Sequence, residues 1–345
     1  MPMNRGKPIT RGLVGLFSFA AACVAGPANA QMLKAVKDRG ALNCGVSEGL
    51  YGFSARDGKG NWSGFDVDLC RAIAAAIFND ASKVNYTPLE ASRRFQALQS
   101  GSIDVLSRNT TWTMSREIEL GLSFAATNYY DGQGFLIRRA MNKDTALDLD
   151  GAKVCVQTGT TTEPNLTDYF RTNKMKYELI GSVTADGAIK GYDSGLCNVF
   201  TADISQLFAI RLLLSRPDDH IILPDVISKE PLGPAVRQGD TQWLNIVKWV
   251  HFAMINAEEL GVTSKNIDEA MRSEKPDVKR LVGTEGNYGE QIGLTNDWAA
   301  RVVRLVGNYG EVFERTVGIG STLGIPRGIN QLWSTGGIQY APPIR

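Results

Sequence analysis

The alternation of strand and helix patterns along the chain limits its fold more than any other feature. Short apolar stretches with strand character are each followed by segments that carry apolar residues at helical spacing. The strand patterns lie at residues 41–46, 83–89, 103–107, 152–157 and 196–203, and the helix patterns at residues 64–78, 92–101, 159–170, 186–195 and 204–214. Repeated strand–helix units form mostly parallel sheets with helices on both faces, so the sequence predicts an α/β fold.

Two stretches of the chain resemble each other, which suggests two similar lobes. The sequence LQSGSIDVLSRN at 98–109 aligns without a gap with YDSGLCNVFTAD at 192–203. Each stretch has Ser-Gly, an apolar strand and then a polar residue, and Asn109 and Asp203 fall at equivalent positions. A chain of this length also exceeds what one hydrophobic core usually supports.

The expected division is into two lobes and an extension. We assign residues 31–132 and 231–265 to lobe 1, residues 133–230 to lobe 2, and residues 266–345 to a helical C-terminal extension that packs on lobe 1. The stretches YYDGQGFLIRR and VISKEPLGPAV near the lobe boundaries resemble two extended crossings between the lobes.

Residues 1–30 have the pattern of a signal peptide. Three basic residues and no acid precede an apolar run at 12–26, and ANA at 28–30 matches a signal-peptidase site. The run is shorter than the roughly 20 residues that a membrane-spanning helix needs. We therefore expect export to a bacterial periplasm, with an N-terminal membrane anchor or lipoprotein cleavage at Cys23 as the alternatives.

The charge balance argues against nucleic acid as a partner. The formal net charge is +1, and it becomes about −2 when the basic N-terminal segment is removed. Nucleic-acid binding demands a basic surface, which a chain with this balance does not supply.

Four cysteines follow the N-terminal segment. They are Cys44, Cys70, Cys155 and Cys197. An oxidising compartment permits disulfides, and an even number of cysteines fits one or two of them. We expect bridges within each half of the chain, although buried free thiols would also fit the apolar surroundings. The sequence does not give the pairing.

The sequence offers little for catalysis or metal binding. Its two histidines, His220 and His251, lie near no candidate nucleophile or ligand cluster. The motifs Cys-x-x-Cys, His-Glu-x-x-His and Gly-x-Ser-x-Gly do not occur. We expect no metal, no cofactor and no covalent catalysis.

Polar residues follow the ends of several predicted strands. In parallel α/β sheets, ligands bind outside the carboxyl ends of the strands. This rule selects residues 47–51, 109–116 and 158–162, together with Asp203. The stretch SRNTTWTMSRE at 107–117 crowds hydroxyl groups, an amide and two guanidinium groups into one loop. We interpret these four places as parts of one polar cleft.

Arg116 is the candidate for binding a carboxylate. Its planar guanidinium group can make two parallel, charge-assisted hydrogen bonds to that group. Asn109 and Thr111 are two positions apart, so both could face the cleft beside it. The alternative is a surface ion pair of Arg116 with Glu117 or Glu119.

The segment GTTTEP at 159–164 and Asp203 would complete a site with both signs of charge. The threonines would present hydroxyls and free backbone N–H groups at a helix N-terminus, which attracts anions. Asp203 at a strand end could hold an ammonium group. Together with Arg116 they describe a receptor for a zwitterion, and ordinary helix N-caps by a threonine and by Asp203 are the alternatives.

These motifs resemble bacterial periplasmic amino-acid-binding proteins, solute-binding family 3 of ABC transporters. The shared pattern is GFDVDLCRAI, LQSGSIDVL, a Thr-x-Thr run followed by Arg, GTTTE and a strand that ends in Asp, over about residues 40–265. The stretches SRNTTWT, YYDGQGF, SKEPLGPAVRQGD, IGLTNDWAARV and WSTGGIQYAPPIR are similar to the general L-amino-acid-binding branch, and extend the likeness to nearly the whole chain after residue 30.

The resemblance implies a two-lobed periplasmic-binding-protein type II fold and a set of site residues. It assigns the carboxylate of a free L-amino acid to Arg116, Asn109, Thr111 and Thr161, and the ammonium group to Asp203. It further implies a monomer without a cofactor that delivers its ligand to inner-membrane ABC permease subunits.

Further cleft candidates are Ser47, Tyr51 and Thr162. Narrower family members carry an acid and then a stacking aromatic where this chain has Ser47 and Leu50, so broad substrate acceptance is expected. The alternatives are a narrower glutamate/glutamine-type binding protein, or an enzyme similar to periplasmic cyclohexadienyl dehydratases with Glu48 or Glu163 as its acid.

Overall fold

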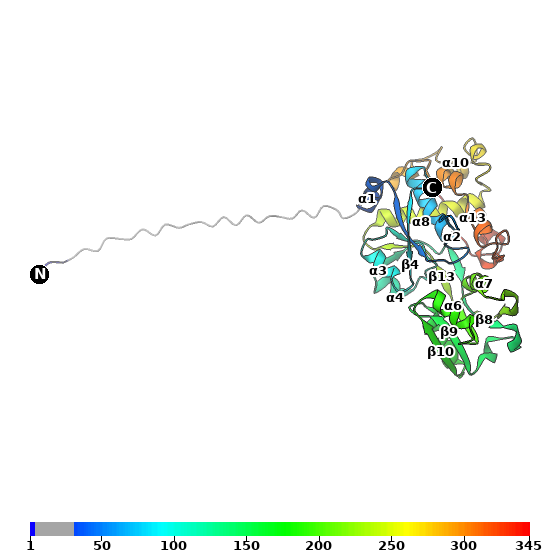
Figure 1. The fold of residues 1–345 in the computed structure, drawn as a ribbon. Helices are drawn as coiled ribbons and strands as arrows, with labels where there is room; N and C mark the ends of the chain where they lie inside the picture. The colour runs from blue at the N-terminus through cyan, green and yellow to red at the C-terminus, as the bar shows by residue number, and fades with distance from the viewer. Residues whose placement is uncertain (4–30) are drawn as a thin grey trace.

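The computed structural model describes residues 1–3 and 31–345. The expected signal peptide, residues 1–30, lies outside the described residues apart from its first three positions. From residue 31 the chain forms two five-stranded sheets flanked by helices, followed by a helical C-terminal part (Figure 1). The α/β fold predicted from the strand–helix alternation is confirmed.

Lobe 1 is the part built on the sheet with strand order β4-β1-β5-β14-β6. Its strands are β1 (Leu42–Ser47), β4 (Val84–Leu89), β5 (Val105–Leu106), β6 (Leu122–Phe124) and β14 (Ala235–Arg237), and a small hairpin is formed by β2 (Ala55–Arg56) and β3 (Trp62–Ser63). Its helices are α1 (Gln31–Arg39), α2 (Phe65–Phe78), α3 (Arg94–Gln99), α4 (Met114–Ile118) and α8 (Thr241–Glu259). β1 is parallel to β4 and β5, whereas β14 is antiparallel to β5 and β6, because the chain returns to this sheet from lobe 2.

Lobe 2 is the part built on the sheet with strand order β10-β9-β11-β8-β12. Its strands are β8 (Gln133–Arg138), β9 (Ala152–Gln157), β10 (Tyr177–Ser182), β11 (Val199–Asp203) and β12 (His220–Ile222), and its helices are α5 (Thr162–Thr172), α6 (Ala185–Asp193) and α7 (Ile204–Leu213). β9 is parallel to β10 and β11, and β8 is antiparallel to β11 and β12.

Two crossings join the lobes. β7 (Tyr129–Asp131) leads out of lobe 1 and β13 (Glu230–Leu232) leads back, and the two strands pair antiparallel with Glu230 opposite Asp131. Figure 1 shows β13 between the two lobes. The two strands therefore form a short ribbon between the lobes.

The start of α2 shows how the sequence fixes a local turn. Gly64 precedes the helix with φ 131°, and a Cβ on it would lie 2.2 Å from the carbonyl oxygen of Phe53. Only glycine fits such a close approach of two backbones. At its other end the helix stops at Asn79, which adopts the left-handed conformation common at helix C-termini.

Each lobe contains one disulfide. Cys44–Cys70 joins β1 to α2, and Cys155–Cys197 joins β9 to the loop before β11. Both bridges lie within one half of the chain, as expected, and the structure supplies the pairing that the sequence does not give.

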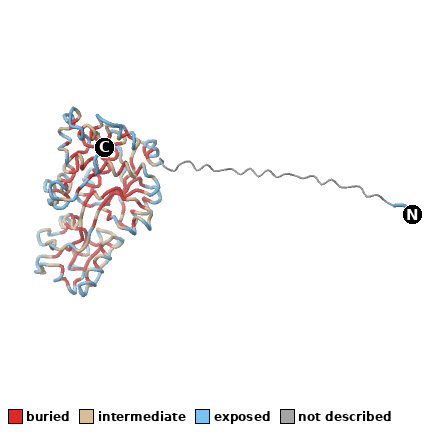
Figure 2. The backbone as a smooth tube through the Cα atoms, turned by 180° about the vertical axis from the view of Figure 1, so that it is seen from behind, coloured by how far each residue is buried: buried red, intermediate tan, exposed pale blue. Residues whose placement is uncertain are grey.

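The extension shares a hydrophobic core with lobe 1. Its helices are α9 (Ile267–Ala270), α10 (Pro276–Val282), α11 (Tyr288–Gln291), α12 (Trp298–Leu305) and α13 (Tyr309–Thr316). Here α12 packs on α2 and α8, and α13 packs on α8, so that one apolar cluster runs through both parts. Lobe 2 has two smaller apolar clusters of its own. Figure 2 shows buried residues in the interior of both lobes.

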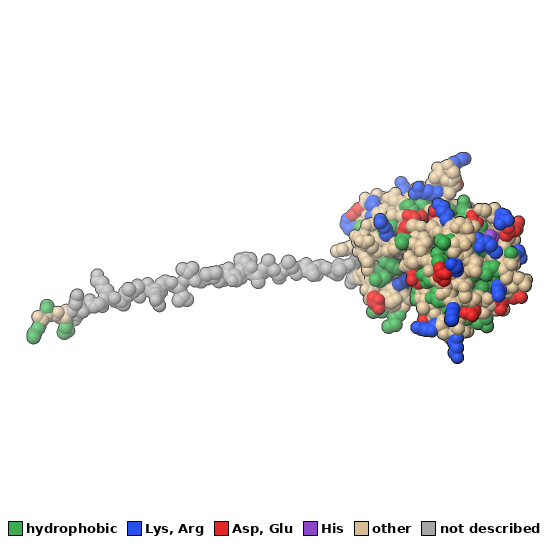
Figure 3. All heavy atoms as spheres, turned by 60° about the horizontal axis from the view of Figure 1, so that its bottom comes forward, with side chains coloured by type: hydrophobic (Ala, Val, Ile, Leu, Met, Phe, Trp, Pro, Cys, Tyr) green, Lys and Arg blue, Asp and Glu red, His purple; other side chains and the backbone are tan. Residues whose placement is uncertain are grey.

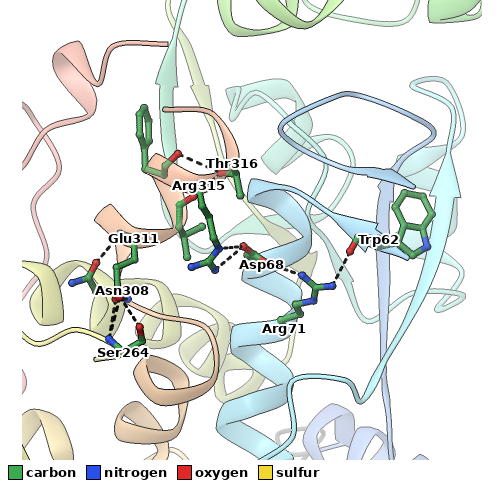
Figure 4. Close-up of polar contacts among 10 residues, drawn as sticks. Trp62, Asp68, Arg71, Ser264, Asn308, Glu311, Arg315 and Thr316 are labelled. Atoms are coloured by element: carbon green, nitrogen blue, oxygen red, sulfur yellow. Dashed lines mark hydrogen bonds and ion pairs between the residues drawn. The ribbon is translucent and has the colours of Figure 1, made fainter. Parts of the chain in front are cut away.

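Polar contacts fix the extension to lobe 1 as well. Arg315 on α13 donates from Nε and Nη2 to Oδ2 of the buried Asp68, at 3.0 and 2.7 Å. Arg71 donates from Nη1 to the other oxygen of Asp68 and from Nη2 to the backbone oxygen of Trp62 (Figure 4). The Asp68 carboxylate therefore links the extension, α2 and the β3 hairpin.

The extension also holds the β7 crossing. The side-chain amide of Asn330 accepts a hydrogen bond from the backbone N–H of Tyr130 (2.7 Å) and donates to its carbonyl oxygen (2.9 Å). Phe313 stacks on Tyr129, with ring centroids 5.9 Å apart. The first residues of the crossing are therefore bound to lobe 1 and the extension.

The surface carries both signs of charge. On the face drawn in Figure 3, basic and acidic side chains are interspersed, whereas a nucleic-acid site requires a gathered basic patch. Among residues 1–3 and 31–345, none of the helices has the length and apolar character needed to cross a membrane.

Replacing Phe313 by alanine should destabilise the protein. Phe313 is completely buried between Phe65, Tyr129 and Tyr309, so its truncation should lower the free energy of unfolding by about 3–5 kcal/mol. Urea unfolding measures the change. Ile319→Ala is the control, since that side chain is 71% exposed and its loss should cost about 0.5 kcal/mol or less. Equal effects of the two changes would contradict a shared core.

Candidate functional site

A cavity of about 330 Å³ lies between the two lobes. Lobe 1 lines it with Ser47, Glu48, Gly49, Leu50, Leu89, Glu90, Arg94, Arg108, Asn109 and Thr111, and lobe 2 with Gln157, Thr160, Thr161, Thr162, Ala185, Asp186, Ile189, Asp203, Gln206, Ile210 and Leu213. Most of the polar residues follow the carboxyl ends of β1, β4, β5, β9 and β11, as the rule for parallel α/β sheets predicts.

The structure brings most of the residues suggested by the sequence together in this cavity. Those that line it are Ser47, Asn109, Thr111, Thr161, Thr162 and Asp203. Arg116 and Tyr51 are not among its lining residues. The Tyr51 side chain is half exposed, and it lines a different hollow, between lobe 1, the end of α7 and the extension.

Arg116 lies next to Thr111, which lines the cavity. It is 8% exposed, and its Nη1 donates to the backbone oxygen of Thr111 at 2.8 Å. Its guanidinium carbon lies 5.1 Å from the centre of the Phe95 ring. The ion pair of Arg116 with Glu117 or Glu119, the alternative from the sequence, is not among the ion pairs of the described residues.

Arg94 lines the cavity, and the sequence analysis missed it. Its side chain is 3% exposed, and its Nε has no hydrogen-bond partner within the described residues. Burial, together with the positive charges of Arg108 and Arg116, lowers the pKa of Arg94 well below its usual range. The Asp203 carboxylate opposes this shift through its charge. A buried guanidinium group with an unpaired nitrogen is costly, so an anionic ligand that accepted from it would stabilise Arg94.

A signal for Arg94 was present in the sequence. Arg94 is the first residue of α3 and follows the end of β4 by only a few positions. A positive side chain is unfavourable in the first turn of a helix, where the helix dipole is itself positive. An arginine at such a place, close to a strand end, therefore indicates a partner outside the helix.

Asp203 supplies negative charge on the opposite side of the cavity. It ends β11 and is 6% exposed, and its side chain makes no capping hydrogen bond to α7. Asp203 is therefore the N-cap residue of α7, the position considered from the sequence, but its carboxylate does not cap the helix. Burial, and then the charges of Asp131 and Glu230, raise the pKa of Asp203 well above its usual range. A bound cation would stabilise the ionised carboxylate.

Asp66 and Arg108 shape the loop that carries Asn109. Asn109 has φ 28°, a conformation that few residues other than glycine adopt. Its backbone N–H donates to Oδ2 of Asp66 at 2.9 Å, and Arg108 Nε donates to the backbone oxygen of Leu89 at 2.9 Å. Burial raises the pKa of Asp66 to about 7. These contacts hold the loop against β4 and α2.

Glu230, on the β13 crossing, lies behind the two cavity threonines. Its Oε2 accepts hydrogen bonds from Oγ1 of Thr111 at 2.5 Å and of Thr161 at 2.9 Å. Its Oε1 accepts from Asn165 Nδ2 and from Ser228 Oγ, both at 2.7 Å. The sequence analysis missed this residue too, because an acid in an extended segment gives no periodic signal.

The remaining wall of the cavity is chemically mixed. Glu90 in lobe 1 accepts a hydrogen bond of 3.4 Å from Nε2 of Gln157 in lobe 2. Burial and the neighbouring Glu48 raise the pKa of Glu90. Leu89 and Leu213 add apolar surface. Such a wall offers partners for polar and apolar groups alike.

The two histidines lie outside the lining of the cavity. Neither His220 nor His251 lines it, and His220 Nδ1 is hydrogen-bonded to the Tyr192 hydroxyl at 2.8 Å. Within residues 1–3 and 31–345, no group of three or more metal-ligating side chains is present.

Residues 42–266 match the family model of bacterial extracellular solute-binding proteins, family 3. The general L-amino acid-binding periplasmic protein AapJ of Rhizobium johnstonii is 56% identical over 323 residues, which are 93% of this chain and 95% of that protein. The glutamate/glutamine/aspartate/asparagine-binding protein BztA of Rhodobacter capsulatus is 49% identical over 326 residues, with 94% and 96% covered. These matches include much of the extension, which the family model leaves out.

A solved structure has the same fold over nearly the whole chain. It is an ABC transporter/periplasmic binding protein from Brucella ovis with glutathione bound, 53% identical in sequence. It superimposes with a TM-score of 0.91 and covers 92% of this chain and 100% of its own.

Replacing Arg94 by methionine should stabilise the ligand-free protein. An unsatisfied buried polar group costs about 1–3 kcal/mol, and methionine fills a similar volume without charge. The free energy of unfolding, measured with urea, should therefore rise by that amount. Arg93→Met is the matched control, because the adjacent Arg93 is exposed and its change should have little effect. A large loss of stability in Arg94→Met would contradict the absence of a partner.

Replacing Asp66 by asparagine should make stability less sensitive to pH. The folded pKa of Asp66 is about 7, against about 3.9 in an unfolded chain, so the wild type loses stability from this group as the pH rises from about 4 to about 7. The stability of Asp66→Asn relative to wild type should therefore increase over that range. Asp57→Asn, at an exposed carboxyl with a lowered pKa, should give no such increase. A pH-independent difference for Asp66→Asn would refute the raised pKa.

Proposed function

Since the chain belongs to family 3 of the bacterial extracellular solute-binding proteins, we propose that it is the periplasmic substrate-binding component of an amino-acid ABC uptake system. It closes its two lobes on a free L-amino acid. The relatives that match almost its whole length are named for amino-acid binding. The cavity between its lobes has the charges that such a ligand requires.

One observation carries this proposal. The cavity has the buried and incompletely hydrogen-bonded Arg94 in lobe 1 and the buried carboxylate of Asp203 in lobe 2. An L-amino acid presents a carboxylate and an ammonium group on one carbon atom. A zwitterion can therefore compensate both buried charges at once, whereas a neutral sugar or a simple anion cannot.

The ligand carboxylate would bind to the arginines of lobe 1. We propose Arg94 as a principal partner, because its guanidinium group faces the cavity without a complete set of acceptors. Arg116, the candidate from the sequence, uses Nη1 for Thr111 and keeps two other donor nitrogens for the ligand. Asn109 lies beside them in the cavity. Asp203 would bind the ammonium group.

Broad specificity fits the wall where the ligand side chain would lie. Glu48, Glu90 and Gln157 offer polar partners, and Leu89 and Leu213 offer apolar surface. The position expected to carry a fixed acid is Ser47, which also lines the cavity. We therefore expect acidic, amide and small apolar L-amino acids to bind.

Closure would follow from contacts with both lobes. We propose the lobe boundaries given by the sequence, with residues 31–132 and 231–265 in lobe 1, residues 133–230 in lobe 2, and residues 266–345 as the extension. A ligand that touches Arg94 and Asp203 together gains contacts only when the lobes approach, so it favours the closed arrangement.

Localisation and partners follow from the same proposal. A relative at 56% identity is named as periplasmic, and we propose the periplasm for this chain and inner-membrane permease subunits as its partners. A monomer suffices, because one chain supplies both sides of the cavity. We propose a receptor rather than a dehydratase, because the matching family and the relatives over almost the whole chain are named for binding. Of the two acids considered for such an enzyme, Glu48 lines the cavity and Glu163 does not.

A thermal-shift panel of the twenty L-amino acids tests this function. Mature protein, stripped of bound ligand by unfolding and refolding, should show a raised melting temperature with several chemically different amino acids. A ligand at 100 times its Kd stabilises a protein by about 2.7 kcal/mol. Arg94→Met should lose most of the shift and Arg93→Met should keep it. Absence of a shift with every amino acid would refute the receptor function.

A further inference from the structure

Glu230 is a buried acid at the point where the two lobes and the crossing ribbon meet. It is 1% exposed, and its carboxylate accepts four hydrogen bonds from side chains. One donor, Thr111, belongs to lobe 1, whereas Thr161 and Asn165 belong to lobe 2 and Ser228 lies beside Glu230 on the returning segment. The carboxylate therefore gathers donors from both sides of the cavity.

The contacts with Glu230 settle where the threonine protons point. A hydroxyl group has one proton to donate and two lone pairs that can accept. The hydroxyl oxygens of Thr111 and Thr161 lie 2.5 and 2.9 Å from Oε2 of Glu230 and 3.4 Å from each other, so the shorter contacts direct both protons to Glu230. Towards the cavity, which both residues line, their hydroxyl groups can then offer only lone pairs.

Two acceptors cannot hold a carboxylate, but they can hold an ammonium group. Glu230, Asp131 and Asp203 make this end of the cavity negative, since the charges of Glu230 and Asp131 both act on the carboxyl of Asp203. A ligand carboxylate here would be repelled by these charges, whereas a cation would be attracted. The arginines Arg94 and Arg116 lie on the lobe 1 side, so the two ends of a zwitterion are distinguished.

We propose that Glu230 is a positioning residue that turns Thr111 and Thr161 into acceptors for the ligand ammonium group, beside Asp203. This inference rests on the proposed amino-acid receptor function. It changes the role that the sequence suggested for the two threonines, from the carboxylate end of the ligand to its ammonium end. It also makes Glu230, which does not line the cavity, a determinant of specificity for amino acids over their hydroxy analogues.

The change Glu230→Gln tests the proposal. Glutamine has the same shape, but one of its two ends is an N–H₂ group that donates, so it cannot accept from all four donors. Either the threonine pair or the Asn165–Ser228 pair must rearrange. Loss of the negative charge further weakens the attraction for an ammonium group.

The readout is a ratio of two affinities measured by calorimetry. The probes are L-glutamate with (S)-2-hydroxyglutarate, and L-alanine with L-lactate, so that each pair differs only in the ammonium group. Wild type should bind the amino acid more tightly in at least one pair. In Glu230→Gln this preference should fall by about tenfold or more, which corresponds to about one lost charge-assisted contact.

Ser228→Ala is the matched control, because it tests whether the loss of any hydrogen bond to Glu230 on the returning segment has the same effect. It removes one hydrogen bond to Oε1 of Glu230 and leaves both threonine bonds to Oε2 in place. Its preference for the amino acid should stay within about threefold of the wild-type value. Circular dichroism and melting temperature establish that each variant is folded. If Glu230→Gln does not fold, Thr161→Val removes one of the two acceptors, and the same fall in preference is expected.

The outcomes separate this proposal from the receptor function. If wild type binds amino acids and Glu230→Gln weakens both members of a pair equally, or leaves the preference intact, the positioning role is overturned while the receptor function stands. If wild type binds none of the twenty L-amino acids, the receptor function and the positioning role both fail.

Discussion

Desolvation of charge between the two lobes is the constraint around which this molecule is built. Arg94 and Asp203 are almost completely buried, Nε of Arg94 has no hydrogen-bond partner within the described residues, and burial shifts the pKa of each group towards its uncharged form. Such a site is unstable by itself and requires stable surroundings. These come from separate cores in the two lobes and one disulfide in each. The cores and disulfides that stabilise the protein lie within the lobes, whereas the buried charged groups Arg94 and Asp203 lie between the lobes.

The extension supports strand β7, which is one of the two crossings between the lobes. It completes the core of lobe 1, and its Asn330 and Phe313 hold the residues Tyr130 and Tyr129 at the start of β7. The beginning of the crossing therefore moves with lobe 1. Glu230 on the paired strand bonds to side chains of both lobes. In the ribbon between the lobes, β7 is therefore held by the extension, whereas Glu230 on β13 contacts both lobes.

Much of this architecture could be predicted from local sequence patterns. Strand–helix alternation predicts the α/β fold, and the rule for strand ends brings Asn109, Thr161 and Asp203 to one cavity. The reversed strands β8 and β14 and the disulfide pairing could not be predicted, because they depend on how distant segments meet. Glu230 was missed for a related reason. It is an ordinary charged residue in an extended segment, and becomes distinctive only through burial and through partners far along the chain. Arg94 differs, because its place in the first turn of α3, close to a strand end, is visible in the sequence, whereas its burial is not.

The most direct test of the account is a crystal structure of the mature protein with L-glutamate. The account predicts the ligand between the lobes, with its α-carboxylate on Arg94 or Arg116. Its ammonium group should lie within hydrogen-bond distance of Asp203 and of Oγ1 of both Thr111 and Thr161. A ligand bound with these two groups exchanged, or bound outside the cavity between the lobes, would contradict the account.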